Sequence, residues 1–194
     1  LKKRGDKLYV VSRRGNNLSN NLKIDLLDEE DIRQKLRKLF TRKKINNLIF
    51  SHRYRGDDSA EDFQVSLHSV ELIIDLLKDQ LPKNSSIVII NSIAIRTIID
   101  DQPQRYHLIR GALEQLVKYS ATKLGNKGIR VNCILVTKII KPENKKYFLK
   151  KNNPVRKMME SITPLKRMGT ALDVAHLVDF LTNDLIGQIN YTTG

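Results

Sequence analysis

The stretch Ser86-Ile-Val-Ile-Ile-Asn-Ser92 is an apolar run that ends in two polar residues. An amphipathic segment over about residues 103–124 follows it, and a second apolar run, Ile129-Arg-Val-Asn-Cys-Ile-Leu135, comes next. Two short apolar runs joined by a long amphipathic segment are typical of parallel strands connected by a helix. The stretch therefore predicts strands at residues 86–91 and 129–135 of one parallel sheet.

The same alternation continues on both sides of this stretch. Further strands are predicted at residues 8–12, 22–25, 47–51 and 188–192, and further helices at about residues 28–42, 60–78 and 170–181. Short strands separated by helices fit neither a β-sandwich nor a helical bundle. We expect a single α/β domain over residues 1–194, with a doubly wound parallel sheet in a three-layer α/β/α Rossmann fold.

Residues 1–5 have the pattern of a helix end, with Gly5 as the stop, directly before the first predicted strand. A βαβ unit needs about 30 residues. We therefore expect a first strand and most of a first helix to precede Leu1.

Residues 136–157 are rich in lysine and asparagine, contain Pro142 and Pro154, and are too long for a plain connection. In an open α/β sheet, ligands bind beyond the carboxyl ends of the strands. Because this segment follows such an end, we predict that it is a substrate lid.

The composition narrows the classes of function. The chain has 35 basic and 21 acidic residues, and its formal net charge is +14. The basic residues are spread along the chain among acidic ones, which argues against a nucleic-acid binder. Cys133 is the single cysteine, so an intrachain disulfide is excluded, and the apolar runs are far shorter than the ~20 residues of a membrane span. We expect a reducing, cytoplasmic setting with no membrane insertion.

A series of short motifs runs through the chain in a recognisable order. Ser92 ends a predicted strand, Tyr106-His-Leu-Ile-Arg110 opens the next predicted helix, and the motifs after it are Gly111-Ala-Leu-Glu-Gln-Leu116, Lys127-Gly-Ile-Arg-Val-Asn132, Pro164-Leu-Lys-Arg-Met-Gly169, Asp173-Val-Ala175 and Gly187-Gln188. Upstream lie Val10-Val-Ser-Arg13 and Asp25. In this order the motifs resemble those of the short-chain dehydrogenase/reductase family.

The resemblance implies an oxidoreductase that transfers a hydride between a nicotinamide and a small carbonyl or alcohol substrate. It implies that Ser92 binds the substrate oxygen and that Tyr106 is the proton donor. A tyrosine needs a nearby cation to exchange a proton at neutral pH. Four residues along a helix bring side chains to one face, so Arg110 is expected beside Tyr106, in the place of the family's lysine.

The expected cofactor follows from the residues upstream in the chain, around the first predicted strand. Arg13 and Arg14 follow a strand whose end faces the adenosine ribose in Rossmann folds, where arginine accommodates the 2′-phosphate of NADP. NADP(H) is therefore expected rather than NAD(H). The resemblance also implies cofactor contacts for Ser12, Asp25 and Ser51, and for Tyr106 and Arg110.

The chain also departs from the family pattern. Phe50-Ser-His-Arg53 stands where relatives have Asn-Asn-Ala-Gly, and the sequence suggests bulky side chains against the cofactor. Ser66 replaces an asparagine, Arg110 replaces lysine, and Val136-Thr137 replaces Pro-Gly. The family's glycine-rich phosphate loop would lie before Leu1.

Three alternatives remain open from the sequence. The first is an active NADP(H)-dependent oxidoreductase, the second a catalytically impaired relative that acts as a cofactor-binding or regulatory subunit, and the third a nucleic-acid binder. We expect a homodimer or homotetramer formed through the helices at residues 60–78 and 103–124, which are more apolar than one buried face requires. His52 and His68 have no carboxylate or thiol at ligand spacing in the sequence, so no metal site is expected.

Overall fold

The computed structural model of this chain describes residues 5–14, 20–41, 43–183 and 189–190, and its strands form two parallel sheets. β1 (Val10–Ser12) pairs with β2 (Asn21–Lys23), and β4 (Ser86–Ser92) lies between β3 (Asn47–Phe50) and β5 (Arg130–Val136). Every pairing is parallel. The prediction of a parallel sheet is confirmed.

Helices follow the strands as the alternating pattern predicts. They are α1 (Glu29–Phe40), α2 (Ser59–Phe63), α3 (Ser69–Leu77), α4 (Gln104–Gly125), α6 (Pro154–Ile162) and α7 (Ala171–Leu181). Short helical turns fill the connections: η2 (Gln64–His68), η3 (Lys78–Gln80), η4 (Ile93–Ile95), η5 (Pro142–Asn144) and α5 (Lys145–Phe148). Caps fix where helices begin, since the Asp28 side chain accepts from the N–H of Asp31 at the start of α1.

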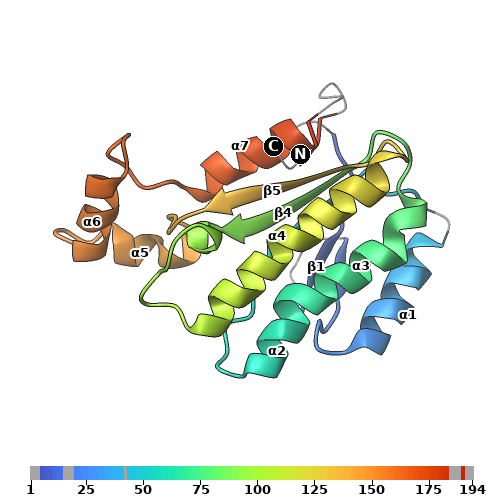
Figure 1. Cartoon of the computed structure of the whole chain (residues 1–194), viewed down its shortest axis with the longest axis horizontal. Helices are drawn as coiled ribbons and strands as arrows, with labels where there is room; N and C mark the ends of the chain where they lie inside the picture. The colour runs from blue at the N-terminus through green and yellow to red at the C-terminus, as the bar shows by residue number, and fades with distance from the viewer. Residues whose placement is uncertain (1–4, 15–19, 42, 184–188, 191–194) are drawn as a thin grey trace.

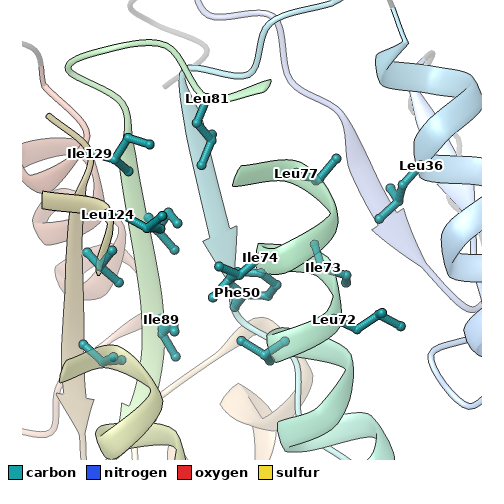
Figure 2. Close-up of a cluster of buried hydrophobic side chains, with 14 of the residues drawn as sticks. Leu36, Phe50, Leu72, Ile73, Ile74, Leu77, Leu81, Ile89, Leu124 and Ile129 are labelled. Atoms are coloured by element: carbon teal, nitrogen blue, oxygen red, sulfur yellow. The ribbon is translucent and has the colours of Figure 1, made fainter. Parts of the chain in front are cut away.

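Alternate side chains of the central strands point to opposite faces, and each face is covered by helices. Ile87 and Ile89 pack in the larger core with residues of α3 and α4, whereas Val88 packs with Val178 of α7. Figure 1 shows α4 and α7 on opposite sides of β4 and β5, and Figure 2 shows Phe50 close to Ile74 in the larger core. This arrangement is the three-layer α/β/α fold that the sequence predicts.

Several predicted elements differ in detail. The helix predicted at residues 60–78 is divided into α2, the π-helical turn η2 and α3. Ile189 and Asn190 are the described residues of the strand predicted at 188–192, and they lie beside β5 without forming a strand. There the Asn190 Oδ1 accepts from the Val131 N–H at 2.8 Å. The helix end predicted at residues 1–5 lies outside the described residues except for Gly5, whose φ is +84°.

Residues 136–157 are more regular than the sequence indicates, because α5 and the start of α6 lie within them. A small core of Phe148, Met159 and Met168 holds these helices together. They lie beyond the carboxyl ends of β4 and β5 (Figure 1). In the described part of the chain, each helix is too short or too polar to cross a bilayer.

Candidate functional site

A cleft of ≈ 1050 Å³ opens where the carboxyl ends of β3, β4 and β5 meet. We call it the strand-end cleft, and the residues that line it include Ser51, His52, Arg53, Asn91, Ser92, Tyr106, Arg110, Val136, Thr137, Lys138, Lys141 and Glu143. Parallel strands bring their carboxyl ends to one edge of a sheet, which is why ligands bind there in open α/β folds. Four predicted site residues lie together in this cleft: Ser51, Ser92, Tyr106 and Arg110.

Ser92 is held at the end of β4 by two hydrogen bonds. Its Oγ accepts from the Ala94 N–H at 3.2 Å, and its own N–H donates to the Asn91 Oδ1 at 2.9 Å. Its hydroxyl hydrogen has no acceptor among the residues that the structure describes, so it is available to a ligand. Ser92 is buried at the base of the cleft.

Asn91 is a positioning residue that sequence reasoning missed. Its Nδ2 donates to the Arg110 main-chain oxygen at 2.9 Å while its Oδ1 binds the Ser92 N–H. One buried side chain therefore ties the end of β4 to the first turns of α4. A polar residue at the end of an apolar run was the available signal, but its partner lies nineteen residues later in the sequence.

Tyr106 and Arg110 lie on one face of α4, as their spacing predicts. The Arg110 Cζ is 4.8 Å from the centroid of the Tyr106 ring. Arg110 is buried, and its Nε has no hydrogen-bond partner within the described ranges. Burial lowers the pKa of the Arg110 guanidinium, but arginine stays protonated in proteins. The cation beside Tyr106 is therefore permanent.

The segment Phe50-Ser-His-Arg53, which replaces Asn-Asn-Ala-Gly, does not direct all of its bulky side chains into the cleft as the sequence suggests. Phe50 is not directed against a cofactor, because its ring is buried in the core with α3. The His52 Nε2 lies 2.9 Å from the Val65 main-chain oxygen, and burial lowers the pKa of this imidazole. Only Arg53 brings a long exposed side chain to Tyr106, with its Cζ 5.3 Å from the ring centroid. Sequence reasoning treated Arg53 as a departure and missed this contact.

Ser66 holds that segment in place. Its Oγ donates to the Asp62 Oδ1 at 2.8 Å and accepts from the Tyr54 N–H at 3.0 Å. Asp62 also meets the Arg105 Nε at 3.5 Å. Because Ser66 and Asp62 are buried, this network fixes the loop that carries Arg53.

The remaining predicted cofactor residues do not line the strand-end cleft. Ser12, Arg13 and Arg14 lie at the end of β1, where Arg13 and Arg14 are exposed and the Ser12 Oγ donates to the Asn21 Oδ1 at 3.3 Å. The Asp25 Oδ1 accepts from the Leu27 N–H at 3.1 Å in the turn before α1. A second hollow of ≈ 560 Å³ beside α1 contains none of the predicted residues; Leu22, Lys35 and Lys38 are among its lining.

One sequence expectation about histidine is wrong. His68 does have carboxylates beside it, because its Nε2 lies 2.9 Å from the Glu29 Oε1 and its Nδ1 3.4 Å from the Glu71 Oε2. These two carboxylates and the imidazole form a surface cluster of polar contacts. Within the described part of the chain, no three or more His, Cys, Asp or Glu side chains are grouped so that they could hold a metal ion.

Comparison with known proteins decides the family. Residues 49–194 match the protein family described as enoyl-(acyl carrier protein) reductase. The chain belongs to the short-chain dehydrogenase/reductase family. A tropinone reductase homologue of Arabidopsis thaliana is 33% identical over 145 residues, which cover 73% of this chain and 45% of the relative. L-rhamnose 1-dehydrogenase (NAD(P)(+)) of Sphingomonas sp. is 29% identical over 135 residues, which cover 68% of this chain and 51% of the relative.

The solved structures agree on the fold. A short chain dehydrogenase family protein from Francisella tularensis has a TM-score of 0.75 at 22% identity, over 90% of this chain and 79% of that one. The chain spans about half the length of the curated relatives it matches.

Proposed function

We propose that this protein is an NADP(H)-dependent oxidoreductase that interconverts a small carbonyl compound and its alcohol in a reducing, cytoplasmic setting. The observation that carries the proposal is the shared cleft of Ser92, Tyr106 and Arg110. A hydroxyl, a phenol and a permanent cation are the groups that stabilise and protonate a developing alkoxide.

The residues of the strand-end cleft fit a nicotinamide cofactor. The hydroxyl of exposed Ser51 is open to a ribose or amide, and the guanidinium of Arg110 lines the same cleft. A bound nicotinamide supplies or accepts the hydride. Ser51, Tyr106 and Arg110 would hold its ribose end, and the cleft is large enough for part of the dinucleotide and a small substrate together.

Each residue of the chain then has a distinct task. Ser92 donates its free hydroxyl hydrogen to the substrate oxygen, and Asn91 fixes the position of Ser92. Tyr106 gives its phenolic proton to that oxygen during reduction and takes it back during oxidation. Arg110 favours the phenolate that this exchange leaves behind.

NADP(H) is favoured over NAD(H) by Arg13 and Arg14, which are exposed at the end of β1. Planar guanidinium groups bind phosphate through paired hydrogen bonds. Ser12 and Asp25 would border the adenosine. Residues 136–157 would cover the substrate, since Val136, Thr137 and Lys138 already line the cleft.

The test is NADPH oxidation by the full-length protein across a panel of ketones and aldehydes. Tyr106→Phe removes the phenolic hydroxyl, so turnover is lost, while the affinity for NADPH falls far less because Ser51 and Arg110 keep their contacts with the cofactor. Tyr119→Phe, on the exposed surface of the same helix, is the matched control. Full activity in Tyr106→Phe would remove this residue from the mechanism.

A catalytically impaired binding or regulatory subunit is the second candidate. The observation that favours it is the pair of arginines beside Tyr106, because relatives have lysine at position 110 and a small residue at position 53. This candidate predicts that the parent protein binds NADPH and oxidises it with no compound of the panel. The two functions are therefore separated by the same experiment.

A further inference from the structure

We propose that the strand-end cleft takes substrates in which the carbonyl group is accompanied by an anionic oxygen group, a carboxylate or a phosphate, and that Arg53 binds this anion. The proposal deepens the proposed oxidoreductase function and names its substrate class.

The charge of the cleft is the first observation. Five cationic side chains line it, and Glu143 is the one carboxylate among its described lining residues. Glu143 lies 3.4 Å from Arg55, and Lys138 forms an ion pair with Asp101. The other three cations, Arg53, Arg110 and Lys141, have no carboxylate within 4 Å in the part of the chain that the structure describes. The interior of the cleft is therefore net positive and attracts anions.

Arg53 is the cation best placed to receive an anion. Its side chain is exposed in the cleft, and it makes no ion pair or hydrogen bond with the described residues. Its guanidinium lies over the Tyr106 ring, 5.3 Å from the Cζ to the centroid. The hydrogen bond from the Tyr54 N–H to the buried Ser66 keeps the adjacent backbone in place. The backbone that carries Arg53 is therefore fixed, and its guanidinium is free to bind an anion in the cleft.

Two like charges lie beside one ring, and an anion bound there would be attracted to both. The Cζ atoms of Arg53 and Arg110 lie 5.3 and 4.8 Å from the Tyr106 centroid. Besides burial, the positive charge of Arg53 contributes to lowering the pKa of Arg110. A carboxylate or phosphate beside Arg53 would offset this repulsion and would accept two parallel hydrogen bonds from its planar fork.

The position of Arg53 also sets the length of the substrate. An anion on Arg53 lies close to Tyr106 and therefore only a few bonds from the oxygen that Tyr106 would protonate. Short oxo acids and small phosphorylated ketones fit this distance. The phosphates of the dinucleotide are the competing anions, so the test must separate cofactor from substrate.

The experiment compares matched charged and neutral probes on the full-length protein. The carboxylate pair is levulinate and methyl levulinate, and the phosphate pair is dihydroxyacetone phosphate and dihydroxyacetone. Dissociation constants are measured by calorimetry with and without NADP⁺, and kcat/KM with NADPH. The variants are Arg53→Gln, the charge-retaining Arg53→Lys, and Arg33→Gln on α1 as the control, since Arg33 is a half-buried arginine outside the cleft.

We expect the charged member of at least one pair to bind the parent at least tenfold more tightly than its neutral partner. Arg53→Gln should lose about tenfold or more of that affinity, Arg53→Lys should keep part of it, and Arg33→Gln should change nothing. The neutral members and NADPH should bind Arg53→Gln as they bind the parent. Dependence of only one pair on Arg53 identifies the anion as a carboxylate or a phosphate.

Three results would overturn the proposal: equal binding of charged and neutral members to the parent, an unchanged charge preference in Arg53→Gln, or a loss of NADPH affinity as large as the loss for the charged probes. Because calorimetry measures binding without turnover, it tests the anion site separately from the proposed oxidoreductase activity. Arg53-dependent binding of a charged probe in a protein that oxidises no NADPH would support the anion site and contradict the oxidoreductase. Thermal unfolding of each variant verifies that it is folded.

Discussion

Removing the Asn91 side chain should destabilise the protein and misplace the site together. In Asn91→Ala, the Ser92 N–H loses its buried acceptor, and the Arg110 main-chain oxygen loses a donor but stays within α4. An unsatisfied buried N–H costs about 1–3 kcal/mol, and the second lost hydrogen bond about 0.5–1.5 kcal/mol. We therefore expect the free energy of unfolding to fall by roughly 1.5–4.5 kcal/mol, or about 3–18 °C in Tm for a domain of this size.

Urea unfolding of the full-length protein, followed by circular dichroism, measures this change. Asn126→Ala is the matched control, because Asn126 is an exposed asparagine at the end of the same helix and should change the free energy by less than about 0.5 kcal/mol. A loss of less than about 0.5 kcal/mol in Asn91→Ala would refute the reasoning, since it would mean that water or another group replaces both bonds without cost.

Three further predictions concern the cofactor, the pH dependence of stability and assembly. Arg13→Ala/Arg14→Ala should abolish a preference for NADPH over NADH in fluorescence titrations, and a parent that prefers NADH would contradict the assignment of these residues. Burial raises the pKa of the Cys133 thiol to about 11 in the folded protein. As the pH rises from about 9 to 11, the thiol therefore ionises in the unfolded chain before it does so in the folded protein, and the free energy of unfolding should fall by up to about 2 kcal/mol. Cys133→Ser should remove this fall from the free energies that urea unfolding gives across the same pH range. Leu108 and Tyr119 are exposed on α4, and light scattering at micromolar concentration should give a dimer or tetramer that Leu108→Glu weakens.

The elements that sequence reasoning predicted are those whose signal is local. Ile87, Val88 and Ile89 belong to one continuous apolar run in β4, and such a run is typical of a strand buried on both faces. Residues 136–157 gave no such signal, because α5 is a single turn and α6 begins only at Pro154. Elements this short depend on contacts with Phe148 and Met159, which periodicity does not reveal.

In the site, too, the contacts that could be predicted are those between residues close in the sequence. Tyr106 and Arg110 could be paired from sequence because four residues along a helix fix their separation. Arg53 could not be placed in the same way, since its contact with Tyr106 joins a loop after β3 to the start of α4. The direction of Phe50 was also misjudged, because only the packing of α3 against β3 decides which face of the strand is the core.

The exchange of lysine for arginine at position 110 follows from the surroundings that the structure gives it. Arg110 is buried, its Nε is unpartnered in the described ranges, and Arg53 adds a second positive charge beside the same ring. Both burial and a like charge favour the neutral form of a cationic group. A lysine, with an ordinary pKa of about 10.4, would be drawn toward neutrality there, whereas a guanidinium remains charged. Arginine at position 110 therefore keeps a cation beside Tyr106 in a site where Arg53 is also present, and the two departures from the family pattern are best explained as one.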